Sequence, residues 1–128
     1  MRNFLLKRGK SFHFAFAGCR YVIQTQQNAW IHAFVSFIVI LLGFWLQINW
    51  RDWAVILLTM ALVWVAEFFN TALETVVDLI NPGQHDLARI SKDVGAAAVL
   101  IAAYCSVLVG LLILGPPLWS KLQILLNF

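Results

Sequence analysis

Three long apolar stretches most restrict what this chain can fold into. Residues 29–48 contain only His32, Ser36 and Gln47 as polar groups, and residues 53–80 and 86–114 are also predominantly apolar. A helix of about 20 apolar residues crosses the hydrocarbon core of a bilayer. Because 62% of the 128 residues are hydrophobic and only 12% are charged, the composition excludes an ordinary soluble domain. The sequence predicts an all-α integral membrane protein of one domain, residues 1–128, with three transmembrane helices.

Short polar segments separate the predicted spans. Residues 49–52 form a polar turn with tryptophan anchors, and residues 81–84 (Asn-Pro-Gly-Gln) break the second span. Asp86 is the expected N-cap of the third span. The two prolines at positions 116 and 117 are expected to end that helix, and the remaining residues are expected to form a short interfacial tail.

The first 28 residues are typical of an amphipathic helix on a membrane surface. Apolar and polar residues recur at helical spacing on opposite faces: Phe12, Ala15, Phe16, Cys19 and Ile23 against His13, Arg20, Gln24 and Gln27. Arg2, Lys7, Arg8, Lys10 and Arg20 all precede the first acidic residue, Asp52, within a net charge of +3. A nucleic-acid partner is not indicated, because nothing soluble is left to form a binding domain. Basic residues stay on the cytoplasmic side, so the N-terminus and residues 67–93 are both expected there.

The second span contains a stripe of polar side chains. At about 100° per residue, five of them fall within about 100° of one another on the helix surface: Glu67, Asn70, Thr71, Glu74 and Asp78. A carboxylate beside lipid costs free energy, so a row of them on an apolar helix indicates a functional site. The alternative is a helix end that leaves the membrane with its polar face in water.

Depth separates the two glutamates of the stripe. With Trp53 at the outer interface, Glu67 lies roughly 21 Å and Glu74 roughly 31 Å along the helix, against a hydrocarbon core of about 30 Å. They are two turns apart and cannot chelate one ion together. Glu74 at the water boundary suits Mg²⁺, which binds one or two carboxylates and substrate phosphates, and Glu67 suits a general base. Lys92 suits phosphate binding, and Asp93 would either hold the Lys92 side chain in place or bind through a water molecule. The alternative is that the two residues form an ordinary salt-bridged helix start.

Three segments of the chain resemble the signature of the small bacterial diacylglycerol kinase and undecaprenol kinase family. They are AEFFNTALETVVD at residues 66–78, HDLA at 85–88 and SKDVGAAAVL at 91–100. The resemblance extends from about residue 7 to residue 114. It implies an ATP- and Mg²⁺-dependent lipid kinase of the bacterial inner membrane, acting on the primary hydroxyl of a lipid at the cytoplasmic interface. It also implies a homotrimer with composite active sites between subunits.

The same resemblance assigns roles to individual residues. Glu67 corresponds to the base that deprotonates the lipid hydroxyl, Glu74 to a metal and ATP ligand, and Asn70 and Asp78 to polar members of the same site. Two further sets are implied: nucleotide contacts at Lys7, Phe14 (where the family often has Tyr), Gly83, Gln84, His85, Lys92 and Asp93, and lipid contacts at Arg20, Glu67 and Ala96.

The chain departs from the family pattern at Gln26. The family's surface helix usually supplies a second acidic metal ligand there, eight residues after the glycine that matches Gly18. The Gln26 amide oxygen can still bind Mg²⁺ and contact ATP, but it lacks the negative charge of a carboxylate. The departure therefore implies weaker metal binding. Trp30 stands where an arginine is expected, while Asn28 and His32 match the family pattern. Asn28, His32 and residues 70–72 (Asn-Thr-Ala) resemble the undecaprenol kinase branch somewhat more closely.

Two other functions and two lipids remain open at this level. A small proton-coupled transporter would use Glu67 as its membrane carboxylate but leaves Glu74 and Lys92 unexplained. A non-catalytic membrane adaptor would fit the loss of the acidic ligand at Gln26. For a kinase, diacylglycerol and undecaprenol both present a primary hydroxyl, and residue chemistry does not separate them.

Overall fold

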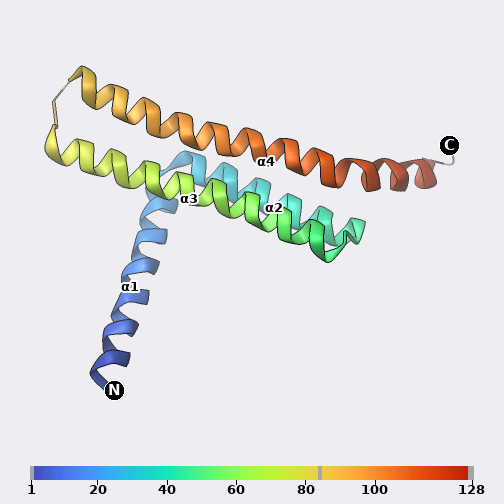
Figure 1. Ribbon diagram of the computed structural model, residues 1–128, viewed down its shortest axis with the longest axis horizontal. Coiled ribbons are helices and arrows are strands. Elements are labelled where there is room, and N and C mark those ends of the chain that lie inside the picture. Colours follow the sequence, from blue (N-terminus) through green and yellow to red (C-terminus); the bar gives the residue numbers. More distant parts are fainter. Residues whose placement is uncertain (1, 84, 127–128) are drawn as a thin grey trace.

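The computed structural model describes residues 2–83 and 85–126, with side chains from residue 10 onward. These residues form four helices: α1 (Arg2–Thr25), α2 (Gln27–Leu46), α3 (Trp50–Ile80) and α4 (Asp86–Leu126). In Figure 1, α3 and α4 lie side by side along the long axis, α2 lies beside α3, and α1 leaves this bundle at a steep angle.

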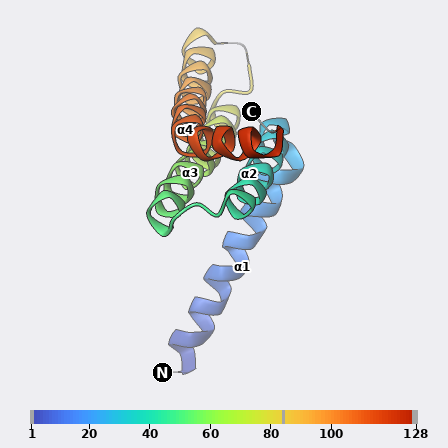
Figure 2. The same ribbon diagram turned by 90° about the vertical axis from the view of Figure 1, so that its right-hand side faces the viewer.

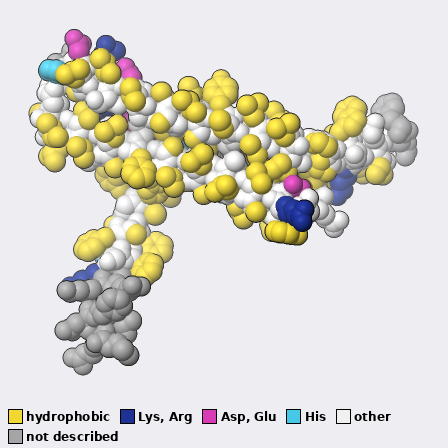
Figure 3. Space-filling view, viewed as in Figure 1, with side chains coloured by type: hydrophobic (Ala, Val, Ile, Leu, Met, Phe, Trp, Pro, Cys, Tyr) yellow, Lys and Arg dark blue, Asp and Glu magenta, His cyan; other side chains and the backbone are white. Residues whose placement is uncertain are grey.

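Three of these helices are long and apolar enough to cross a membrane. In the described part of the chain they are α2, α3 and α4, with mean hydropathies of 2.2, 1.8 and 2.7 in their most apolar windows. Charged side chains gather at the two ends of the bundle, and apolar side chains cover the surface between them (Figure 3). The predicted all-α fold, with three helices long and apolar enough to cross a membrane, is confirmed.

The turn between α2 and α3 is closed by local hydrogen bonds. Gln47 has a left-handed backbone with φ 55°, and the N–H of Ile48 donates to the Gly43 carbonyl at 3.2 Å. The Asn49 side-chain oxygen then accepts from the N–H groups of Arg51 at 2.9 Å and Asp52 at 3.0 Å. This capping satisfies backbone donors that have no partner inside α3. The turn is therefore short, and α2 and α3 run antiparallel.

The expected end of the third span at Pro116 is wrong. Helix α4 continues through Pro116 and Pro117 to Leu126. Each proline removes one backbone donor and disturbs the preceding turn, and Figure 2 shows the C-terminal part of α4 turned aside. Beyond the prolines, the Lys121 ammonium donates to the Trp45 carbonyl of α2 at 2.5 Å. A long-range contact thus stabilises a segment that local sequence predicts to be a separate tail.

Helix α4 begins one residue differently from the prediction. Asp86 is its first helical residue rather than its N-cap. The N–H of Leu87 donates to the His85 Nδ1 at 3.2 Å, and the N–H of Arg89 donates to the His85 carbonyl at 3.1 Å. His85 therefore caps this helix start.

Candidate active site

Glu67 is buried at the interface of α2 and α3. Only 1% of the residue is exposed, and neither carboxyl oxygen has a hydrogen-bond partner in the described part of the chain. The neighbouring polar atom is the His32 Nε2 of α2, 3.8 Å from Glu67 Oε2. Burying a polar group without a hydrogen bond costs free energy. Glu67 is therefore kept at a cost to stability, as expected for a reactive group rather than a structural one.

Glu74 lies two turns further along α3 in polar surroundings. The Asn70 amide donates to Glu74 Oε1 at 2.9 Å, and the Gln26 amide donates to Glu74 Oε2 at 3.3 Å. Gln26 lies between α1 and α2 with an extended backbone, φ −102°. The structure therefore brings together two residues that are 48 positions apart and that sequence analysis assigned to one metal site.

Close packing of α4 against α3 buries Asn70. A Cβ atom added at Gly95 of α4 would collide with the Asn70 Oδ1 and approach Leu73 Cδ2 to 3.1 Å. A larger residue at this position would force the Asn70 side chain to move, so the glycine allows the two helices to pack closely here. The Asn70 Oδ1 is buried and has no hydrogen-bond partner among the described residues. It is a free oxygen beside Glu74.

A polar cleft of about 740 Å³ opens where α3 ends and α4 begins. Its lining comes from both helices and the loop between them: Asp78, Asn81, Gly83, His85, Asp86, Ala88, Arg89 and Lys92. The Lys92 ammonium donates to Asp78 Oδ1 at 2.5 Å. The cleft therefore contains four of the predicted site residues, and its volume is within the range of ligand pockets.

Asp93 has a different partner from the one expected. It does not hold Lys92 but accepts from the Arg89 guanidinium at 3.3 Å, and both side chains are exposed. Arg89 lines the cleft together with Lys92 and is a candidate that sequence reasoning missed. It lies three positions before Lys92, on the same face of α4, and this spacing could have identified it.

Other predicted site residues lie apart from this cleft. Phe14 is 70% exposed, Arg20 on α1 and Ala96 on α4 are also exposed, and none of the three lines the cleft. Helix α1 leads away from the bundle (Figure 1). The Lys7 side chain and Gln84 lie outside the described residues.

The donor set at Glu74 fits a magnesium ion bound with a nucleotide. The described residues contain no group of three His, Cys, Asp or Glu side chains placed for a metal. Mg²⁺ in phosphate-transfer sites needs only one or two carboxylates, because phosphates and water complete its shell. Glu74 supplies one carboxylate, and the amides of Asn70 and Gln26 are in contact with it.

The fold and the site define a small integral membrane protein with a buried carboxyl group at Glu67, a second carboxylate at Glu74 that accepts hydrogen bonds from two amides, and a polar cleft at one end of its long apolar helices. The profile of the prokaryotic diacylglycerol kinase family matches residues 13–114. The chain therefore belongs to this family of lipid kinases, and the family resemblance in the sequence is confirmed.

Individual relatives include both kinds of kinase. The chain is 46% identical to a diacylglycerol kinase of Synechocystis over 111 residues, which are 86% of this chain and 63% of that protein. It is 37% identical to the undecaprenol kinase of Bacillus subtilis over 117 residues, 91% of this chain and 95% of that protein. It is 32% identical to the diacylglycerol kinase of Escherichia coli K12 over 83 residues, 65% of each. The matches thus cover under two thirds of two relatives and nearly all of the third.

Proposed function

We propose that this chain is a single-domain, ATP- and Mg²⁺-dependent kinase that phosphorylates the primary hydroxyl group of a membrane lipid, diacylglycerol or undecaprenol. The observation that supports it most is the pairing of a buried carboxyl group without hydrogen bonds at Glu67 with a hydrogen-bonded carboxylate two turns away at Glu74. Family membership favours this reaction over proton-coupled transport or a non-catalytic adaptor role.

Glu67 is the proposed general base. Phosphoryl transfer requires in-line attack, neutralisation of phosphate charge and a group that accepts the hydroxyl proton. As the lipid oxygen attacks the γ-phosphorus, a Glu67 carboxylate oxygen takes the proton and the bond to the leaving ADP oxygen breaks. Burial keeps water, a competing nucleophile, away from this carboxylate.

The nucleotide is placed by residues nearer the helix ends. Glu74, with the amides of Gln26 and Asn70, would hold the metal ion, which offsets phosphate charge when bound. Lys92 and Arg89 line the polar cleft and offset further negative charge on the phosphates. Gly83 and His85 border the same cleft, and Asp93 orients the Arg89 guanidinium.

Orientation and assembly complete the proposal. The basic N-terminal segment favours a cytoplasmic N-terminus in the bacterial inner membrane, with α1 lying on its surface. Phe14 and Arg20 do not reach the cleft of their own chain. A homotrimer with sites shared between subunits would bring α1 of one copy toward the cleft of another.

Substitution of the base tests this function. In purified protein with Mg²⁺, labelled ATP and each lipid, Glu67→Gln should lower kcat by at least about 100-fold, because a positioned base contributes about 10² to 10⁴. Nucleotide binding should be retained. Asp52→Asn is the matched control, because Asp52 lies in the turn at the opposite end of α3. Normal turnover by Glu67→Gln would refute the base assignment, and no label in any lipid with the wild-type protein would refute the kinase function.

A further inference from the structure

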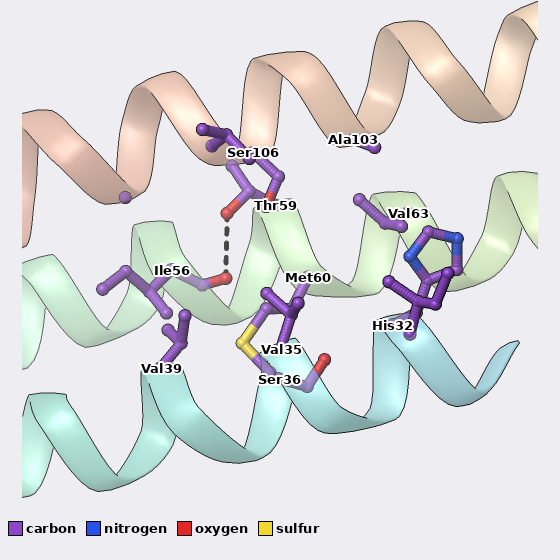
Figure 4. A pocket seen from close by; sticks show the side chains of 13 residues that line it. His32, Val35, Ser36, Val39, Ile56, Thr59, Met60, Val63, Ala103 and Ser106 are labelled. Atoms are coloured by element: carbon purple, nitrogen blue, oxygen red, sulfur yellow. Dashed lines mark hydrogen bonds between the residues drawn. The ribbon is translucent and has the colours of Figure 1, made fainter. Parts of the chain in front are cut away.

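A cavity of about 200 Å³, open on one side, lies among α2, α3 and α4. Three of its lining residues, Ile31, Val35 and Val107, are also exposed on the outside of the bundle. Figure 4 shows Val35 and Val39 of α2, Ile56 and Met60 of α3 and Ser106 of α4 around it. All three spanning helices contribute to its wall.

The wall of this cavity is apolar in its chemistry. Most of the lining side chains end in methyl groups. The Thr59 hydroxyl is already used, because it donates to the Ile56 carbonyl at 2.9 Å (Figure 4). An apolar cavity takes up hydrocarbon in preference to water. The cavity therefore suits a hydrocarbon ligand.

One end of the cavity meets the buried carboxyl group. His32 lines the cavity, and its Nε2 is 3.8 Å from Glu67 Oε2. Along α3 the lining runs from Ile56 to Val63, and Val63 precedes Glu67 by about one turn. The space thus begins beside the proposed base and extends roughly 16 Å away from it, toward the other end of the bundle.

We propose that this cavity binds the hydrocarbon chain of the lipid alcohol whose hydroxyl group is presented to Glu67. The proposal rests on the proposed kinase function and names the tail site of its substrate. A cavity of about 150 Å³ holds a molecule the size of benzene, so about 200 Å³ accommodates a stretch of one hydrocarbon chain. A diacylglycerol would leave its second chain outside, so we expect a single-chain alcohol, such as a polyprenol, to depend more on this cavity.

Gly110 offers a direct way to fill the cavity. It lines the space, and a Cβ atom added there meets nothing within 4 Å. Gly115 lies on the same helix, is equally open to a Cβ atom and lies outside the lining. Comparing Gly110→Leu with Gly115→Leu therefore separates the effect of filling the cavity from the effect of replacing a glycine within the helix.

Kinetics of this pair test the proposal. Gly110→Leu should raise the KM for a polyprenol about tenfold or more, leave the KM for ATP unchanged and affect diacylglycerol less. Gly115→Leu should leave all three constants unchanged. If Gly110→Leu keeps the wild-type KM for polyprenol, the tail site is refuted while the kinase function stands. An equal rise for diacylglycerol would refute the single-chain preference.

A second measurement uses the unaltered protein and does not depend on the folding of a variant. A polyprenol with a photoreactive diazirine in its chain, irradiated with wild-type protein, should label lining residues that are buried from the bilayer, such as Ile56 and Val63. Labelling confined to the outward-facing residues Leu58 and Leu112 would show that the chain stays in the bilayer and would overturn the proposal. Phosphate transfer by the same sample, measured in parallel, distinguishes this outcome from failure of the kinase function.

Discussion

At the scale of single residues, Glu67 and Glu74 share a helix but not an environment. Glu67 is buried without a hydrogen bond in the described structure, whereas Glu74 accepts from the amides of Asn70 and Gln26. The first environment suits a base that acts on a lipid, and the second suits a metal ligand. Two chemically identical side chains thus have separate proposed roles because their neighbours differ.

Restoring a carboxylate at position 26 should strengthen metal binding. The Gln26 side chain touches Glu74 at 3.3 Å, so Gln26→Glu places a second negative charge beside the proposed ion. A gain of about 1 kcal/mol would lower the Mg²⁺ concentration for half-maximal activity about fivefold. Gln24→Glu adds the same charge on the exposed surface of α1 and should change this concentration little. An Mg²⁺ requirement unaffected by Gln26→Glu would remove Gln26 from the metal site.

At the scale of the elements, α1 exposes large apolar side chains. Phe12 and Phe16 are 67% and 73% exposed, and Figure 3 shows apolar side chains along the described part of this helix. Cys19 continues their face at helical spacing, and Gln24 lies on the opposite face. A membrane surface would cover the first face and leave the second in water.

Spin labels on α1 test this placement in vesicles. In a Cys105→Ser background, a nitroxide at Cys19 should collide more with oxygen, which concentrates in lipid, than with a water-soluble nickel reagent. In a Cys19→Ser, Cys105→Ser, Gln24→Cys protein the preference should be reversed, because this label faces water. Equal exposure of both labels to the nickel reagent would mean that α1 does not lie on the membrane.

At the scale of the whole molecule, two predicted substrate-contacting residues of α1 lie apart from the cleft of their own chain. Phe14 and Arg20 are exposed and do not line the cleft of their own chain, although the family resemblance assigns them substrate contacts. A composite site between copies would explain this separation.

Assembly is tested by mass and by complementation. Light scattering of the detergent-solubilised protein should give a protein mass three times the 14.5 kDa of one chain. Arg20→Ala and Lys92→Ala should each lower activity, and co-assembly of the two variants should restore part of it, because some shared sites then receive both native residues. A monomeric mass, or mixtures no more active than the separate variants, would contradict shared sites.

The sequence by itself determined the three long apolar helices, except for the end of α4, and the polar stripe. Helix spans follow from the length of apolar runs, and the shared face of Glu67, Asn70 and Glu74 follows from the helical period. Both are local properties, so no knowledge of packing is needed. The same is true of the family signature, which consists of three short segments in α3, the end of the following turn and the start of α4.

Only the tertiary structure decided which distant side chains meet. The contacts of His32 with Glu67 and of Gln26 with Glu74 join different parts of the chain, and no local spacing specifies them. Packing likewise extends α4 past its prolines, because a contact with α2 stabilises the segment beyond them. The cavity beside Glu67 exists only where three helices converge, since the space between helices depends on their relative positions and not on the pattern within any one of them.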